Sequence, residues 1–310
     1  MVQKKILILG GSGFLGTNIF KYLIKNKFRA YSISRSNGYD LRDQQKLQKL
    51  LKKNKFDFIV NSAAHVGGLS YIKKYCADVA EDNLRIYINL YSALKNIKNK
   101  PKIINLISNC VYPHRLILQN ENLIFDGEIH ESVECFGLSK LVLIKLSKYY
   151  FHQYKIKTLN LILPNVYGPG DYLDSTRSHA LNGIITRMIE NKDNNFNIWG
   201  TGKPKREWLF VSDVSRIIKI VLNKKKFFKD FNHINVAQNQ SYSINFIAKL
   251  VKKFLNYKVR LINDLTYPDG ALLKQLDNKK FKKYFNNFTF TPFNVGLSET
   301  IKYYQKVIKL

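Results

Sequence analysis

The sequence has few cysteines, few acidic residues and no long apolar stretch. Its three cysteines, Cys76, Cys110 and Cys135, are widely spaced and odd in number, which excludes a disulfide framework and a cysteine metal site. No segment approaches the ~20 apolar residues that a membrane-spanning helix needs. Residues 1–5 lead directly into an expected strand, which leaves no room for a signal peptide. We therefore expect a protein of the reducing cytoplasm, without a metal and without a membrane partner.

The shortage of acidic residues leaves the chain strongly basic. There are 51 Lys and Arg against 22 Asp and Glu, a formal net charge of +29 at pH 7. Such a charge can indicate a nucleic-acid partner. Here, however, the lysines are scattered among many Asn and Ile residues and form no single basic stripe with stacking aromatics. We expect no nucleic-acid partner, and only a general attraction for anionic ligands.

Short apolar runs alternate with amphipathic stretches along the chain. Continuously apolar runs of this kind are typical of strands buried on both faces of a parallel sheet. Strands that alternate with helices predict an α/β fold with a Rossmann-type doubly wound parallel sheet, which binds ligands at the carboxyl ends of its strands. The expected strands cover residues 5–9, 30–34, 56–61, 103–107 and 159–163.

The 310 residues, 45% of them hydrophobic, are enough to bury a large core. We expect an NADP-binding Rossmann domain over residues 1–164, with a return segment at about 207–236. A smaller, mixed α/β domain over 165–206 and 237–310 is expected to bind the substrate. The chain shows no internal repeat and no low-complexity segment.

Gly10, Gly13 and Gly16 follow the first expected strand and open the first helix. Glycine permits a tight turn and a close approach of the backbone to a pyrophosphate, which then lies at the N-terminus of the helix. Between a strand and a helix at the start of an alternating chain, this pattern is a strong signal for a dinucleotide. Phe14 and Leu15 lie inside the motif and are expected cofactor contacts.

The residues after the second and third strands indicate which dinucleotide binds. Enzymes that prefer NAD usually have Asp or Glu after the second strand, whereas Arg35 suits a 2′-phosphate, so NADP is favoured. Asp40 is expected near the adenine edge, by analogy only. Ala63 and Ala64 are small enough to let a nicotinamide ribose lie against the backbone.

The stretch from Ser108 to Lys140 contains the polar groups best suited to chemistry. Ser108 ends the fourth expected strand. Phe136 and Lys140 are four residues apart on an expected helix, and therefore lie on one face of it.

These motifs resemble the extended short-chain dehydrogenase/reductase family, and within it the GDP-L-fucose synthases and the related GDP-heptose 4-keto reductases. The resemblance implies an NADPH-dependent epimerase-reductase that acts on a 4-keto GDP-linked sugar, and a homodimer. Because the two subgroups share much of the pattern, the sugar and the base stay open. The matching stretches are 65–68, 108–113, 163–169, 178–179, 199–202 with 206–207, and 268–270.

The resemblance also assigns roles to residues. It gives Cys110 and His179 the exchange of protons at the carbons that flank the ketone, and a thiol and an imidazole can each give and take a proton near neutral pH. It gives Ser108 a hydrogen bond to the keto oxygen and Lys140 a contact with the nicotinamide ribose. Pro164 and His179 are further expected cofactor contacts.

Phe136 departs from the family's pattern, in which a tyrosine at this position donates a proton. Loss of a positioned general acid typically costs ~10²–10⁴ in rate. Three explanations stay open: the chain is impaired in reduction, another group or water donates the proton, or the hydroxyl was removed by engineering. The otherwise intact site favours engineering. In the last case Phe136→Tyr should raise turnover by at least about tenfold. A reductase without epimerisation and a catalytically silent nucleotide-sugar or NADP binder also stay open.

Expected substrate contacts come mainly from the C-terminal part. Arginines are permanently charged and bind a diphosphate bidentately, and Trp199 suits a sugar or a base. The expected substrate-binding residues are Asn109, Asn165, Arg187, Trp199, Arg206 and Asp269.

Overall fold

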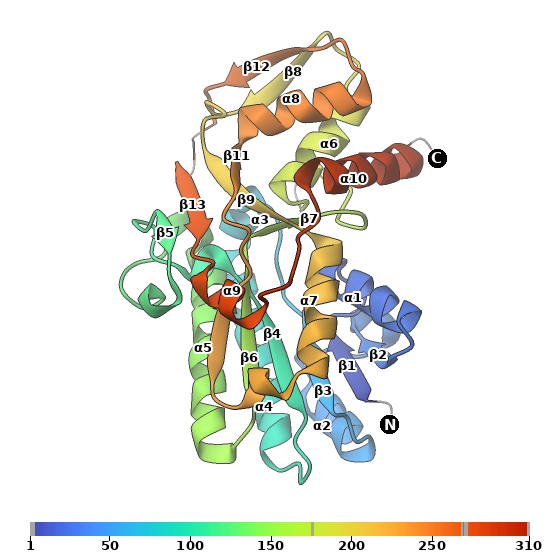
Figure 1. Cartoon of the computed structure of the whole chain (residues 1–310), viewed down its shortest axis with the longest axis vertical. Coiled ribbons are helices and arrows are strands. Elements are labelled where there is room, and N and C mark those ends of the chain that lie inside the picture. The colour runs from blue at the N-terminus through green and yellow to red at the C-terminus, as the bar shows by residue number, and fades with distance from the viewer. Residues whose placement is uncertain (1–3, 175–176, 268, 270–271, 309–310) are drawn as a thin grey trace. The chain divides into compact units, whose positions relative to one another are not determined.

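The computed structural model describes residues 4–174, 177–267, 269 and 272–308. The chain divides into two compact units. Figure 1 shows the order of their helices and strands. The first unit comprises Met1–Val111, Ile129–Ile162 and Ser212–Ile234, and the second comprises Tyr112–Glu128, Leu163–Val211 and Asn235–Leu310.

A six-stranded sheet forms the centre of the first unit, in the order β10-β6-β4-β3-β1-β2. The β1–β2, β1–β3 and β3–β4 pairs are parallel, which confirms the predicted Rossmann-type fold. The sheet's apolar runs are almost completely buried. Its strands are β1 (Lys5–Leu9), β2 (Arg29–Ile33), β3 (Phe58–Asn61), β4 (Lys102–Ser108), β6 (Thr158–Leu163) and β10 (Asn232–Asn235).

Helices flank this sheet. In α4 the buried residues Val79, Asn83, Tyr87 and Leu90 recur every three or four positions, so one face of the helix packs inward, and α4 contacts α5. The helices are α1 (Phe14–Lys25), α2 (Gln44–Lys53), α3 (Leu69–Lys74), α4 (Cys76–Lys95), α5 (Glu134–Tyr154) and α7 (Val211–Asn223); short 3₁₀ turns are η1 (Arg35–Asn37), η2 (Asn109–Val111), η4 (Glu131–Val133) and η5 (Lys225–Phe228).

The second unit has a mixed sheet in the order β11-β9-β13-β5, with β7 paired to β9, and a separate parallel pair of β8 and β12. The helix α6 contacts α8 and α10. The strands are β5 (Leu118–Gln119), β7 (Asn165–Tyr167), β8 (Asn195–Trp199), β9 (Lys205–Phe210), β11 (Ser241–Ser243), β12 (Arg260–Asp264) and β13 (Leu273–Leu276); the helices are η3 (Glu121–Leu123), α6 (Ala180–Glu190), α8 (Ile244–Leu255), α9 (Lys279–Tyr284) and α10 (Phe293–Ile308).

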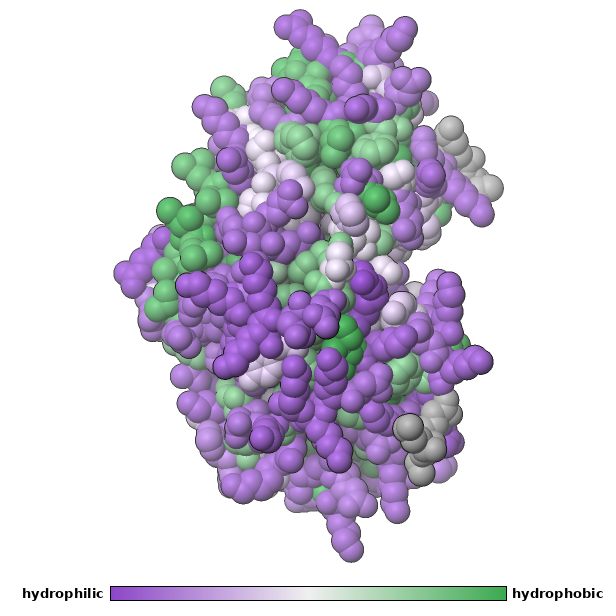
Figure 2. All heavy atoms as spheres, in the orientation of Figure 1, coloured by the Kyte–Doolittle hydropathy of each residue, from purple (hydrophilic) through white to green (hydrophobic). Residues whose placement is uncertain are grey.

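On the face shown in Figure 2, hydrophilic side chains are interspersed with smaller apolar patches. Within the described ranges, no helix has the length and apolar character needed to cross a membrane. The same residues contain no cluster of three or more His, Cys, Asp or Glu placed to hold a metal ion.

Candidate active site

The glycine loop between β1 and α1 is a tight backbone turn. Gly10 has a φ of +77°, and its amide and that of Gly11 donate to the Ile33 carbonyl at 2.9 and 3.0 Å. Gly13 donates to the Gly10 carbonyl at 3.0 Å and precedes α1, whose first turn contains no acidic residue. A methyl group on Gly16 would overlap the Gly10 carbonyl. A loop in which Gly10 and Gly16 leave no room for a side chain, at the N-terminus of a helix without a side-chain cap, fits a pyrophosphate.

The first turn of α1 continues this loop. Phe14 is buried, whereas Leu15 is half-buried. Ala63 lies so close to Gly10 that a Cβ on that glycine would overlap the Ala63 backbone. The backbone after β3 therefore lies directly beside the glycine loop.

The end of β2 presents an exposed cation. Arg35 is exposed at the start of η1, where the hydroxyls of Ser34 and Ser36 lie 2.9 Å apart. A guanidinium and two hydroxyls on three consecutive residues are groups that can bind a phosphate. Asp40 instead accepts from Arg42 at 2.6 Å, a hydrogen bond that lowers the pKa of the Asp40 carboxyl. Its contact with adenine stays a prediction.

Four of the predicted catalytic residues gather near the end of β4. The Ser108 hydroxyl accepts a hydrogen bond from the Cys110 amide at 3.2 Å. Lys140 is 4% exposed, and its ammonium donates to the Leu106 carbonyl at 3.1 Å. The same nitrogen lies 5.6 Å from the centroid of the Phe136 ring. The spacing of four on α5 thus puts Phe136 and Lys140 side by side, as the sequence predicts.

Burial gives Lys140 an unusual proton affinity. Desolvation lowers its pKa to about 7, although the charge of Cys110 acts in the opposite direction. No ion pair within the described part of the chain includes Lys140. Near neutral pH this lysine therefore changes its charge easily, which is typical of functional sites.

Phe136 lies in a buried apolar cluster with Ile72 and Val79. Two predicted site residues, Ala64 and Cys110, pack against this cluster. The other side chains packed there are Val66, Tyr71, Tyr75 and Cys135.

A hydrogen-bonded chain runs beside this cluster. His65 contacts Asp82 through Nδ1 at 2.9 Å and the Tyr71 hydroxyl through Nε2 at 2.8 Å. Asn83 fixes the His65 backbone, accepting from its amide at 2.8 Å and donating to its carbonyl at 2.9 Å. Arg42 donates to Asp82 at 2.9 Å. The sequence indicated His65 only as part of a motif. It did not indicate Tyr71 and Asp82, because these residues lie on α3 and α4 without a recognisable spacing.

In the second unit, His179 is held by a buried carboxylate. The His179 amide and Nδ1 both lie 3.0 Å from Asp171, and Asn182 donates to the same oxygen at 2.6 Å. Burial opposes the charged imidazolium, but the hydrogen bond and the charge of Asp171 outweigh it and raise the pKa of His179. The side chain of His179 is 34% exposed. A proton on the His179 imidazole is therefore stabilised and accessible to solvent. No sequence pattern identifies Asp171 as its partner.

Arg187 and Trp199 form a second group in this unit. The Arg187 guanidinium lies 4.2 Å from the centroid of the Trp199 ring, and the Trp199 and Tyr267 rings stack at 4.8 Å. Trp199 is 45% exposed. The stacked, partly exposed rings offer a flat surface to a planar ligand.

The remaining predicted substrate residues are dispersed. Asn165 donates to the Glu207 carbonyl at 3.2 Å, Arg206 donates to the Lys205 carbonyl at 2.9 Å, and Asp269 accepts from the Thr201 amide at 2.9 Å. Their contacts with substrate stay predictions, as does that of Asn109, which is buried. The predicted cofactor contact of Pro164, also buried, stays a prediction too. Pro268 and Gly270, also part of the predicted turn, lie outside the described residues.

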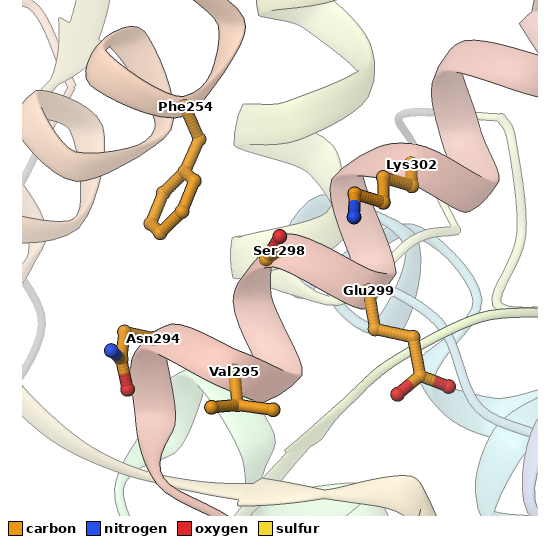
Figure 3. Close-up of a pocket in the computed structure, with 6 residues that line it drawn as sticks. All are labelled: Phe254, Asn294, Val295, Ser298, Glu299 and Lys302. Atoms are coloured by element: carbon orange, nitrogen blue, oxygen red, sulfur yellow. The ribbon is translucent and has the colours of Figure 1, made fainter.

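A hollow of about 450 Å³ lies along α8 and α10. Figure 3 shows the side chains that line it. No predicted site residue is among them: they are Phe254, Asn294, Val295, Ser298, Glu299 and Lys302.

The parallel sheet, the glycine loop and the buried lysine on α5 define a class of enzyme that works with a nicotinamide cofactor. The chain belongs to the NAD dependent epimerase/dehydratase family, whose sequence model matches residues 6–237. This match confirms the family resemblance drawn from the motifs.

Individual relatives give a finer comparison. The chain is 28% identical over 308 residues to the GDP-L-fucose synthase of Dictyostelium discoideum, with 97% of this chain and 95% of that protein covered. Its fold matches the GDP-L-fucose synthetase of Naegleria fowleri bound to NADP at a TM-score of 0.88 and 24% identity, over 100% of this chain and 95% of the other. It matches a GDP-6-OMe-4-keto-L-xylo-heptose reductase from C. jejuni at 0.88 and 22% identity, over 99% of both chains.

Proposed function

We propose that this protein uses NADPH to reduce the 4-keto group of a GDP-linked sugar and that it also epimerises the carbons flanking the ketone. The named activities of the relatives support the substrate class, of the GDP-L-fucose or GDP-heptose type. The observation that carries the proposal is the buried Lys140, with its pKa lowered to about 7, next to Cys110 and Phe136 at the end of β4.

The first unit contains the residues that would hold the cofactor. The glycine loop of Gly10, Gly13 and Gly16 would bind the pyrophosphate, Arg35 the 2′-phosphate and Lys140 the nicotinamide ribose. When bound, NADPH supplies a hydride to carbon 4. The second unit would bind the sugar nucleotide.

Epimerisation needs two groups that exchange protons. A ketone acidifies the C–H bonds on its neighbouring carbons, so a base can remove one proton and an acid can return another to the opposite face. We assign these roles to Cys110 and His179. The raised pKa of His179 keeps its imidazole protonated up to a higher pH, so we assign it the role of the acid.

Reduction needs a donor for the oxygen on carbon 4. The Ser108 hydroxyl can hydrogen-bond this oxygen and stabilise the negative charge that develops there. Phe136 has no proton to give. Phe136→Tyr therefore measures how much the missing phenol slows reduction. If no other group donates the proton, this substitution should raise the rate by ~10²–10⁴.

A cytoplasmic location and a homodimer are part of the same proposal. Light scattering on the purified chain tests the dimer, and fractionation of the source cells tests the location.

The test of the function is turnover of GDP-4-keto-6-deoxymannose with NADPH in deuterated water. NADPH oxidation with deuterium at the flanking carbons supports the proposal, and oxidation without deuterium indicates a reductase alone. Phe136 favours a second candidate, a silent binder. That candidate predicts NADPH binding without any oxidation.

A further inference from the structure

Phe136 leaves the proposed reduction without its expected proton donor, yet a phenol packs against the same cluster. Tyr71, the third residue of α3, packs against the cluster of Ile72, Val79 and Phe136. Its ring also contacts the backbone of Gly67, where a Cβ would overlap it. Ala64 and Cys110 pack against this cluster too, so Tyr71 shares its surroundings with groups already assigned to the cofactor and to proton exchange.

The Tyr71 hydroxyl is connected to a proton relay. It lies 2.8 Å from Nε2 of His65, whose Nδ1 lies 2.9 Å from Asp82. Asp82 also accepts from Arg42 at 2.9 Å, which fixes the carboxylate in place. The side chains of His65 and Asp82 are 17% and 18% exposed, so solvent can resupply the relay with protons. A donor that is regenerated after each turnover is what a general acid requires.

Other protic groups nearby suit the task less well. The Tyr87 hydroxyl is completely buried, and desolvation raises the pKa of this phenol. Burial also raises the pKa of the Cys135 thiol. Tyr71, by contrast, is only half-buried.

We propose that Tyr71 replaces the missing tyrosine at position 136 and donates the proton to the oxygen on carbon 4, with His65 and Asp82 as its relay. This inference rests on the proposed function. As hydride adds to carbon 4, the electron pair of the C=O π bond moves to the oxygen. The O–H bond of Tyr71 breaks and a new O–H bond forms on the sugar. The tyrosinate then takes the proton on Nε2 of His65, and His65 takes up another from the solvent while Nδ1–H stays bonded to Asp82, so each turnover consumes one solvent proton.

A kinetic cycle tests the donor. Tyr71→Phe should slow hydride transfer by ~10²–10⁴, and adding Phe136→Tyr to it should restore most of the rate. Phe136→Tyr alone should change the rate by less than about tenfold. Tyr75→Phe is the matched control, because this neighbouring ring stacks 4.7 Å from that of Tyr71 and carries no assigned role. The control should keep the rate.

A binding measurement tests the same contact without catalysis. With NADP⁺ present, the affinities of GDP-L-fucose and its 4-deoxy analogue are compared in the unchanged protein and in Tyr71→Phe. Loss of one hydrogen bond should weaken binding of GDP-L-fucose by about 3- to 10-fold and leave the 4-deoxy analogue unaffected.

Equal weakening of both ligands, or of neither, overturns the role of Tyr71 and leaves the proposed function standing. A gain of tenfold or more from Phe136→Tyr alone, with an unchanged rate in Tyr71→Phe, also overturns it. If the protein binds neither these sugar nucleotides nor a GDP-heptose, the proposed function fails and this inference fails with it.

Discussion

The buried Lys140 makes the stability of the protein depend on pH in a way that one substitution should remove. Its pKa is about 7 in the folded chain, against ~10.4 for a free lysine. Between these values the unfolded chain binds more protons than the folded one. The free energy of unfolding should therefore rise with pH, by at most ~1.4 kcal/mol per pH unit. Below pH 7 the fold bears the full cost of burying the ammonium group.

Lys140→Met removes this titration while keeping much of the side chain's volume. The variant should be more stable than the unchanged protein near neutral pH, and this advantage should shrink by roughly 2 kcal/mol between about pH 7 and about pH 9. Urea unfolding without cofactor measures both proteins. Lys148→Met is the control, because Lys148 is exposed on the same helix and should change stability by less than ~0.5 kcal/mol. If the difference between Lys140→Met and the unchanged protein is constant with pH, our account of Lys140 is wrong.

Three further predictions concern the cofactor and the proton-transfer groups. Gly16→Ala places a methyl group on the Gly10 carbonyl, so it should weaken NADPH binding and destabilise the fold by about 1–3 kcal/mol in urea unfolding; unchanged binding would contradict the loop's role. Arg35→Ala should weaken NADPH binding by roughly tenfold or more while sparing NADH, measured by nicotinamide fluorescence; equal losses would argue against a 2′-phosphate contact. Asp171→Asn removes the group that raises the pKa of His179, so the imidazolium should be lost at a lower pH. The pH profile of deuterium exchange would then shift downward, and an unshifted profile would exclude His179 as the acid.

Much of the fold could be predicted because its signals are local. The expected strand over residues 5–9, the apolar run before the glycine motif, is β1 (Lys5–Leu9). Helix starts have local signals too: the Ser243 hydroxyl accepts from the Phe246 amide at 3.2 Å at the start of α8. The periodicity of a strand or helix and the capping residues of a helix both depend on residues that are close together in the sequence.

Long-range pairing could not be predicted. The strand β5 is only Leu118–Gln119, and it exists because it pairs with β13, far along the chain. Two residues show no periodicity, so no pattern could have identified this strand.

The candidate site shows the same division. The spacing of Phe136 and Lys140 fixed their shared face, whereas the contact of His65 with Tyr71 and Asp82 depends on how a loop packs against two helices. Asp171 likewise becomes a partner of His179 only because the turn before α6 brings them together. Contacts between residues that are far apart in the sequence depend on tertiary packing, which cannot be inferred from a single sequence.

The most direct test of the proposed function follows NADPH and GDP-4-keto-6-deoxymannose together with the purified protein in deuterated water. The account predicts one NADPH consumed for each keto group lost, with deuterium gained at the carbons beside it. If the protein binds both molecules and neither consumes NADPH nor exchanges deuterium, it is not the reductase proposed here.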